Sequence, residues 1–326
     1  MLITRTPLRI SLGGGGTDLP SYYERRGGFV LAAAITKYVY IGINRTFTDD
    51  YFLKYSALER VQRPDEIRHP IIRSALSLHP VGPSLEIVSL ADIPAGTGLG
   101  SSGTFTVGLL RALHAFKREH ITPGDLAEEA AHLEIELLGE PAGKQDQYIA
   151  AFGGITCFEY SQQGGVQVAP LSLSTATLHD LEEHLLMFFT GYSRDAGGLL
   201  SDQRTRSESG DKAMLTALDY VKELGVEIRD TLRRGDATGF GRLMHEHWLR
   251  KRERSEGMSN EEVDRWYDLA MANGALGGKL VGAGGGGFLL FYAEDQKALR
   301  EAMKKEGLAE VRFGFDFDGS TVVARD

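Results

Sequence analysis

The 326-residue sequence predicts an α+β protein made of two units. Strand-like and helix-like segments occur in both halves, but without the regular βαβ alternation that builds a parallel sheet. The content of 42% hydrophobic and 25% charged residues is typical of a chain that buries a core. A polar, glycine-containing stretch at residues 161–177 separates the two mixed segments. We therefore expect one unit at residues 1–170 and a second at residues 171–326.

The first half is expected to mix strands with helices. Its strand-like segments lie at residues 5–12, 38–47 and 84–90. Apolar side chains at helical spacing then predict a helix over residues 100–116. A second helix is expected to begin with Thr122 as N-cap, Pro123 as first residue and Asp125 as reciprocal capping partner. It should end near Gly139, because glycine favours the left-handed conformation after a helix.

The second half is expected to begin with a buried strand at residues 184–192. Helical periods dominate residues 211–273, where "SNEE" at residues 259–262 has the form of a capping box. Residues 279–293 are glycine-rich and then strand-like. An amphipathic helix over residues 294–307 and a final strand or hairpin over residues 311–324 complete the expected second unit.

Charge and composition restrict the partners. The net charge of −9 disfavours nucleic acid and an anionic membrane, although a local pocket could still bind small anions. We recognise no export signal or membrane span in the sequence, so we expect a cytoplasmic protein with no membrane partner. The single cysteine, Cys157, lies in an apolar run and is expected to be a buried hydrophobic residue, and it excludes an intrachain disulfide.

The stretch "IPAGTGLGSSGTFTV" at residues 93–107 predicts an anion-binding loop. A helix start has unpaired N–H groups with partial positive charge, and glycines let a phosphate approach them closely. The paired serines could contact phosphate oxygens or Mg²⁺. The alternative is a flexible loop whose serine only caps the helix, but three alternating glycines exceed what a cap needs.

Two common phosphate loops do not fit. A P-loop requires a Gly-Lys pair followed by Ser or Thr, and neither "GKQ" at 143–145 nor "GKL" at 278–280 has that hydroxyl residue. A dinucleotide fingerprint requires a third glycine, and "LGGGGTDLP" has Asp18 at that position. The missing third glycine disfavours a dinucleotide-dependent oxidoreductase.

Three glycine-rich segments together resemble the motifs of the GHMP kinase superfamily. They are "PLRISLGGGGTDLP" at residues 7–20, the loop at 93–107, and "KLVGAGGGGFLLFY" at 279–292. The resemblance implies a ribosomal-protein-S5-like N-terminal domain and a ferredoxin-like C-terminal domain with the active site between them. For the third cluster, at 282–287, two interpretations remain open: a support for the phosphate loop, or a tight turn entering a strand.

The resemblance also implies an activity, the transfer of the ATP γ-phosphoryl group to a hydroxyl group with the help of Mg²⁺. The residues expected to bind ATP are Pro94, Gly96, Gly98, Leu99, Gly100, Ser101, Ser102 and Gly103. The expected catalytic residues are Asp146, which would accept or orient the hydroxyl proton, and Arg9, which would keep Asp146 ionised. A non-catalytic nucleotide sensor is disfavoured, because Asp146 and Ser102 are both intact.

The expected metal ligands are Ser102 and Glu134, as implied by the same resemblance. Glu134 cannot be separated by helix face from its neighbours Glu128, Glu129 and Glu136. The metal site should be sparse, since Mg²⁺ takes only one or two protein ligands beside phosphates and water.

Three segments are most similar to those of sugar kinases that phosphorylate D-glycero-D-manno-heptose 7-phosphate at the anomeric oxygen: the first motif, "GKQDQY" at residues 143–148 and "GYSRDA" at residues 191–196. L-Fucose kinases share the first motif and are the alternative. The implied product would be the 1,7-bisphosphate, which leads to nucleotide-activated heptose and surface polysaccharide. The residues expected to bind this substrate are Gly14, Gly15, Thr17, Asp18, Lys144 and Arg194. Lys144 and Arg194 would hold the phosphate already on the sugar. Arg250, Lys251 and Arg252 are weaker candidates for the same phosphate, because their basic run looks more like a solvated helix face. The segment "HEHW" is not a zinc motif, and the partner expected beside the small molecules is a second copy of the chain in a homodimer.

Overall fold

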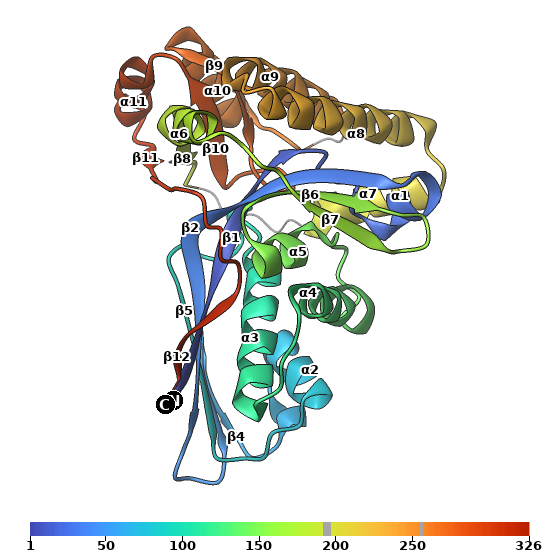
Figure 1. Ribbon diagram of the computed structural model, residues 1–326, viewed down its shortest axis with the longest axis vertical. Coiled ribbons are helices and arrows are strands. Elements are labelled where there is room, and N and C mark those ends of the chain that lie inside the picture. The colour runs from blue at the N-terminus through green and yellow to red at the C-terminus, as the bar shows by residue number, and fades with distance from the viewer. Residues whose placement is uncertain (192–196, 255–256, 326) are drawn as a thin grey trace.

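The computed structural model describes residues 1–191, 197–254 and 257–325 (Figure 1). In this part of the chain, two sheets form, the first mainly from the first half and the second from the second half, together with helices in both, in agreement with the α+β prediction. The first sheet and its helices make the long lower part of Figure 1, and the second sheet with its helices makes the upper part. No described helix combines the length and the apolar character that a lipid bilayer requires of a span.

The first sheet is built around one long strand, β2, which pairs with β1, β5 and β6. The order along the sheet is β12-β1-β2-β5-β3-β4, and β7 continues from β6. The strands are β1 (Leu2–Gly13), β2 (Gly28–Arg45), β3 (Tyr51–Lys54), β4 (Leu58–Val61), β5 (Leu85–Ala91), β6 (Ile155–Tyr160), β7 (Val166–Pro170) and β12 (Thr321–Arg325).

Helices cover this sheet, and one of them, α7, contacts α8 of the second half. The central one, α3, packs on β1 and β2 and has α4 and α5 beside it (Figure 1). The helices of this part are α1 (Pro20–Arg26), η1 (Pro64–Glu66), α2 (Pro70–Leu78), α3 (Ser101–Lys117), α4 (Pro123–Ala131), the π-helical turn η2 (His132–Leu137), α5 (Gln145–Phe152) and α7 (Gly197–Glu208).

The second sheet has the strand order β11-β8-β10-β9. Its strands are β8 (Leu185–Phe189), β9 (Ala275–Leu280), β10 (Phe288–Ala293) and β11 (Ala309–Glu310). The surrounding helices are α6 (Thr175–His184), α8 (Lys212–Arg233), α9 (Ala237–Arg254), α10 (Glu261–Ala272) and α11 (Gln296–Lys305).

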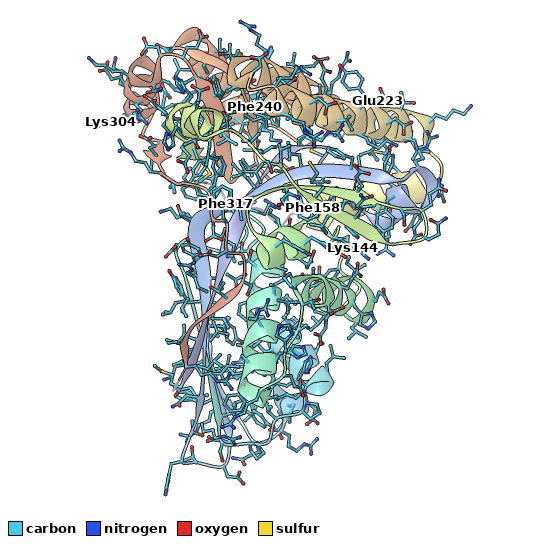
Figure 2. The ribbon with its side chains drawn as sticks, in the orientation of Figure 1. Lys144, Phe158, Glu223, Phe240, Lys304 and Phe317 are labelled. Atoms are coloured by element: carbon cyan, nitrogen blue, oxygen red, sulfur yellow. The ribbon has the colours of Figure 1, made fainter. Side chains whose placement is uncertain are left out.

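One hydrophobic core runs through both halves. Phe158 of β6 and Phe240 of α9, labelled in Figure 2, are both fully buried and belong to the same cluster. Burying a side chain of this size stabilises the fold by roughly 1.5–3 kcal/mol. The halves are therefore held together by apolar packing.

The predicted boundary at residue 170 needs one correction. The strand β12, at the end of the chain, pairs antiparallel with β1 in the first sheet, so residues 321–325 do not belong to a second unit at 171–326. The two ends of the described chain consequently lie side by side (Figure 1). An irregular segment with an isolated bridge, Ile35 to Phe315, leads back to β12 where a final strand or hairpin was expected over residues 311–324.

The predicted helix starts have different outcomes. Thr122 caps α4 by accepting a hydrogen bond from the Asp125 N–H at 3.2 Å, as expected, but the Asp125 carboxylate accepts from the Thr122 hydroxyl at 2.6 Å where the reciprocal bond from the backbone N–H was expected. The box at 259–262 is wrong by one residue, because the Asn260 side chain accepts from the Val263 N–H at 2.9 Å. Ser259 instead donates to the Asp264 carboxylate at 2.6 Å.

The second and third glycine-rich segments pack against each other at the backbone level. Gly98 and Gly282 have φ angles of 86° and 83°, in the left-handed region. A Cβ on Gly282 would lie 2.5 Å from the Gly98 Cα, closer than real contacts allow. The third cluster therefore supports the loop at 93–107, and it also forms the turn that enters β10.

We expect Gly282→Ala to destabilise the protein more than Gly307→Ala does. Both glycines have positive φ, but a Cβ on Gly307 would meet no neighbouring atom within 4 Å, so its substitution costs only the left-handed strain of about 1–2 kcal/mol. Thermal unfolding of both variants is the measurement. An equal loss of stability in the two variants would contradict the close contact between Gly282 and the loop at 93–107.

Candidate active site

A cavity of about 360 Å³ opens where the two halves meet. Its walls come from the end of β1 and the turn after it, the glycine-rich loop and the start of α3, η2, α5, α7, α9 and the end of β9. All three glycine-rich segments contribute to it, although they are far apart in the sequence. The cavity is therefore the candidate active site, as expected from its position between the halves.

Arg9, on β1, binds the carboxylate of Asp146 through two parallel hydrogen bonds. Its Nε donates to Oδ1 at 2.7 Å and its Nη2 donates to Oδ2 at 3.0 Å. Its Nη1 donates to the Gly98 carbonyl, and its backbone N–H donates to the Leu99 carbonyl at 3.0 Å. Two-pronged bonds between charged groups are strong and directional. Arg9 thus fixes the glycine-rich loop relative to Asp146.

Asp146 lies in the first turn of α5, where the partial positive charge of the helix N-terminus favours a carboxylate. Its Oδ1 also accepts a hydrogen bond from Gln145 Nε2 at 3.3 Å. Within the described residues, Oδ2 receives the Arg9 bond alone. The side chain is 26% exposed, so Oδ2 keeps a lone pair for an incoming hydroxyl group.

The glycine-rich loop presents most of its expected ATP-binding residues to the cavity. The residues that line it are Gly96, Gly98, Gly100, Ser101, Ser102 and Gly103. Gly100 has a φ of 76° and is the N-cap of α3, so the amides of the first helical turn are left for an anion. Pro94 and Leu99 do not line the cavity: the Pro94 carbonyl accepts from the Thr97 hydroxyl at 3.0 Å, and Leu99 is fully buried.

The structure distinguishes Glu134 from its three neighbouring glutamates, which helix face alone could not do. Only Glu134 of the four lines the cavity, and its carboxylate accepts from the Ser102 hydroxyl and from Gln147 Nε2 at 2.5 Å. The other three bind basic side chains elsewhere: Glu128 binds Lys144, Glu129 binds His79 and His114, and Glu136 binds His132. The π-helical turn η2 gives Glu134 a different direction from α4, and such turns are frequent at functional sites.

Ser102 and Glu134 form a donor set that fits Mg²⁺. Burial raises the pKa of Glu134 to about 7, because a carboxylate loses its hydration there. A divalent cation supplies the charge that stabilises such a carboxylate, and Mg²⁺ prefers carboxylate and hydroxyl oxygens. The glycine-rich loop beside the pair would leave the remaining positions to phosphates and water.

Asp18 lines the cavity next to Asp146 and is 5% exposed. Its Oδ1 accepts from the Gly16 N–H at 3.0 Å, and its Oδ2 accepts from the Gln145 N–H at 3.1 Å. Burial raises its pKa, and the nearby Asp146 charge acts in the same direction. Each oxygen keeps a lone pair, so the carboxylate can accept ligand hydroxyl groups, and Gly15 lies beside it in the wall.

Two residues expected to bind substrate are structural instead. The Thr17 hydroxyl lies 2.8 Å from the carbonyls of Gly14 and Phe29 and accepts from the Phe29 N–H at 3.0 Å. Thr17 is fully buried, and neither it nor Gly14 lines the cavity. Both hold the turn after β1 against β2.

Two cations, Lys144 and Arg194, were expected to bind the sugar phosphate. Lys144 does not line the cavity, because its Nζ donates to both oxygens of Glu128 at 2.9 and 2.8 Å and to the Gly164 carbonyl at 3.3 Å. Its assignment to a phosphate is therefore wrong in this structure; Lys144 is labelled in Figure 2. Arg194 lies outside the described residues.

Two other lysines line the cavity: Lys251, which was only a weaker candidate for the sugar phosphate, and Lys279, which was not expected at the site. Lys251 was interpreted as part of a solvated face, yet it is 7% exposed and donates to the carbonyls of Leu280, at 3.1 Å, and Gly282. Lys279 is 2% exposed and donates to the Leu12 carbonyl at 3.2 Å. Lysines are seldom buried. Lys279 is the first residue of the third motif, a signal that could have found it, whereas Lys251 contacts that motif only in the folded chain.

Several polar side chains in the cavity wall have an oxygen without a hydrogen-bond partner among the described residues. They are Ser11 Oγ, Gln145 Oε1, Gln147 Oε1 and Gln203 Oε1, all on buried residues. Gln203 also donates to the Gly16 carbonyl at 2.7 Å, which places it next to Asp18. Because buried polar atoms are normally satisfied, this wall fits a ligand with several hydroxyl groups.

Comparison with known proteins identifies the family. Residues 67–154 match the GHMP kinases N terminal domain, and residues 228–309 match the GHMP kinases C terminal domain. The D-glycero-alpha-D-manno-heptose 7-phosphate kinase of Campylobacter jejuni is 31% identical over 97% of both chains. The chain belongs to the GHMP kinase family. Its two-domain GHMP fold and its activity as an ATP-dependent sugar kinase agree with the expectations from the three motifs.

Two further relatives of this GHMP kinase are named as kinases of sugars. The crystal structure of a D-glycero-D-manno-heptose 1-phosphate kinase from Bacteroides thetaiotaomicron superposes with a TM-score of 0.82 and 25% identity, over 100% of both chains. A bifunctional fucokinase/GDP-fucose pyrophosphorylase from Arabidopsis thaliana is 28% identical over 92% of this chain, but only 30% of its own length is covered.

Lys279 predicts a pH dependence of stability in this GHMP kinase. Burial, with the Arg9 charge as a smaller cause, lowers the pKa of Lys279 from 10.5 to about 7. Between these two values the unfolded chain binds more protons than the folded one, so this lysine makes stability rise with pH. We expect Lys279→Met to stabilise the protein most below pH about 7, with the gain shrinking toward pH about 10. Melting temperatures across that range test this, and a gain independent of pH would contradict it.

Proposed function

We propose that this kinase transfers the γ-phosphoryl group of ATP to the anomeric hydroxyl of D-glycero-D-manno-heptose 7-phosphate, giving the 1,7-bisphosphate. One observation carries the choice of acceptor: the relative named as a kinase of this sugar phosphate aligns over 97% of both chains. The polar wall at Asp18 and Gln203 suits a sugar with many hydroxyl groups, and the two buried lysines suit a ligand with more than one phosphate.

The position of phosphorylation is part of the proposal. The structural relative from Bacteroides thetaiotaomicron is named for the 1-phosphate of the same sugar, so it supports the heptose but not the site of transfer. L-Fucose is the second candidate acceptor, favoured by the fucokinase match over 92% of this chain. Fucose carries no phosphate, and it would leave one of the lysines in the cavity wall without an anion to bind.

The reaction begins with the nucleotide phosphates against the amides of the glycine-rich loop. Lys251 donates to the carbonyl of Gly282, which packs on Gly98 of that loop, so its ammonium is close enough to neutralise a phosphate there. Asp18 holds sugar hydroxyl groups on the other side of Asp146. The two substrates then meet between the loop and α5, as in-line transfer requires.

Asp146 orients the attacking hydroxyl through Oδ2 and takes its proton as the bond to phosphorus forms. The bond between the γ-phosphorus and the bridging oxygen breaks, and ADP leaves with that electron pair. Arg9 holds the Asp146 carboxylate in position through its two hydrogen bonds while the proton moves. Ser102 and Glu134 would hold Mg²⁺, which supplies charge neutralisation at the phosphates when it is bound.

Replacing Asp146 by Asn tests the mechanism. The amide keeps the size of the side chain but cannot take a proton and binds Arg9 less strongly, so we expect kcat to fall by about 10²–10⁴-fold. The affinity for ATP, measured by titration calorimetry, should stay near that of the wild type, because the loop amides are unchanged. Unchanged turnover would remove Asp146 from the chemistry.

The acceptor is tested by an assay of ADP release over a panel of sugars and sugar phosphates. We expect the highest kcat/KM for D-glycero-D-manno-heptose 7-phosphate, with the unphosphorylated heptose and L-fucose well below it. Phosphorus NMR of the product should show a new anomeric phosphate. Turnover of fucose without turnover of the heptose phosphate would overturn the proposed acceptor.

A further inference from the structure

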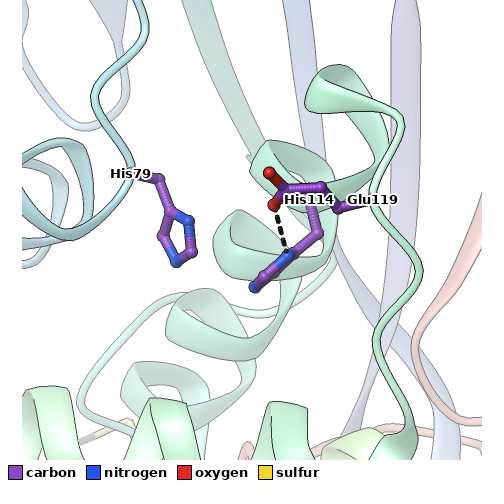
Figure 3. A group of neighbouring side chains, drawn as sticks. All are labelled: His79, His114 and Glu119. Atoms are coloured by element: carbon purple, nitrogen blue, oxygen red, sulfur yellow. Dashed lines mark hydrogen bonds and ion pairs between the residues drawn. The ribbon is translucent and has the colours of Figure 1, made fainter.

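A polar cluster lies in the first half at the ends of three helices, among residues that do not line the active-site cavity. His79 is the C-cap of α2, His114 is in the last turn of α3, and Glu119 follows α3 by two residues (Figure 3). Glu129 of α4 lies next to both rings. The cluster therefore brings together four side chains of the types that bind transition metals.

Glu129 orients the two imidazole rings. One of its oxygens binds His79 Nε2, and the other lies 2.8 Å from His114 Nε2. Because an ionised carboxylate can only accept hydrogen bonds, both Nε2 atoms donate to it. A carboxylate on one ring nitrogen leaves the other nitrogen as the potential ligand, the usual arrangement behind metal-binding histidines.

The second nitrogen of each ring, Nδ1, is bound by a flexible charged side chain. His114 Nδ1 lies 3.2 Å from Glu119 Oε2, the bond drawn in Figure 3. His79 Nδ1 lies 3.3 Å from the ammonium nitrogen of Lys117. Because an ammonium group can only donate, His79 Nδ1 is the acceptor and presents a lone pair, while its proton is on Nε2 toward Glu129.

Lys117 marks a position for a cation. Its Nζ lies 2.9 Å from Glu119 Oε2 as well as 3.3 Å from His79 Nδ1. One ligand atom from each of His79, His114 and Glu119 lies within 4.8 Å of the others, close enough for a single ion to bind all three. Lys117 is the last residue of α3 and its side chain is 27% exposed, so the ammonium group can move into solvent.

We propose that His79, His114 and Glu119 form a Zn²⁺ site, with Glu129 as the outer partner of both histidines. On binding, Zn²⁺ takes the place of the Lys117 ammonium group, and the proton that His114 Nδ1 directs at Glu119 leaves to solvent. Two imidazole nitrogens and one carboxylate oxygen favour Zn²⁺ over Mg²⁺, which prefers oxygen ligands. A water molecule would complete the four-coordinate ion.

The site would join the C-terminal ends of α2 and α3, and through Glu129 it would also reach α4. These helices cover one face of the first sheet. A metal that binds only the folded protein raises its stability by mass action. Zn²⁺ should therefore raise the melting temperature without acting on the phosphoryl transfer.

The test is calorimetric titration of the untagged, EDTA-treated full-length protein with ZnCl₂ in buffer that contains excess MgCl₂, which fills sites built from oxygen ligands. Wild-type protein should bind one Zn²⁺, and Lys117→Met should bind it more tightly, because no ammonium group competes. His114→Gln should lose the binding. Glu129→Gln should weaken it by about 10- to 100-fold, the usual cost of losing an outer partner.

His132→Gln is the matched control, because His132 is a half-exposed histidine whose ion pair among the described residues is with Glu136, one turn along the chain. It should bind Zn²⁺ like the wild type. Glu119→Gln is a second, milder variant that should also weaken binding, in case His114→Gln does not fold. If wild type binds no Zn²⁺, or if His114→Gln and Glu119→Gln bind as tightly as the His132→Gln control, the cluster is an ordinary hydrogen-bonded network and the proposal is wrong.

Discussion

The active site depends on one ion pair, the two-pronged bond between Arg9 and Asp146. Arg9 is on the central sheet, Asp146 is in α5, and the same guanidinium binds a carbonyl of the glycine-rich loop. Three segments that are distant in sequence are therefore held in one geometry by a single side chain. Because the pair is largely buried, removing either partner leaves an uncompensated charge, which is far more costly than losing a surface pair.

The second half of the chain completes this arrangement in two ways. The backbone of Gly282 packs on Gly98, at a distance that excludes any side chain at either position. Lys251 and Lys279 then bring positive charge to the cavity from α9 and β9. A protein with a net charge of −9 can thus bind anionic substrates, because the charges that matter are collected in one buried place.

Much of the fold and the place of the candidate site could be predicted from the sequence. The resemblance of the glycine-rich motifs and of "GKQDQY" to the GHMP kinases implied the loop, Arg9, Ser102 and Asp146, and the structure brings all of them to one cavity. The contacts of Lys144 and Lys251 could not be predicted, because they depend on where side chains of distant elements meet. Lys144 is a plausible phosphate ligand until Glu128 is seen beside it.

The other differences between the sequence-based expectations and the structure have similar causes. The basic run on α9 has the composition of a solvated face, but α9 packs on β9 and buries Lys251. Glu134 and Glu136 both lie in the π-helical turn, yet only Glu134 of the four glutamates lines the cavity, which no helical periodicity reveals. The return of β12 to the first sheet likewise follows from strand pairing with β1.

The central claim is that the glycine-rich loop between Ala95 and Gly103 binds the phosphates of the nucleotide. A crystal structure with a non-hydrolysable ATP analogue and Mg²⁺ tests it most directly. We predict that the phosphate chain lies against the backbone amides of this loop, with the γ-phosphate directed at Asp146. A nucleotide bound elsewhere, with the loop unoccupied, would contradict the account of the site.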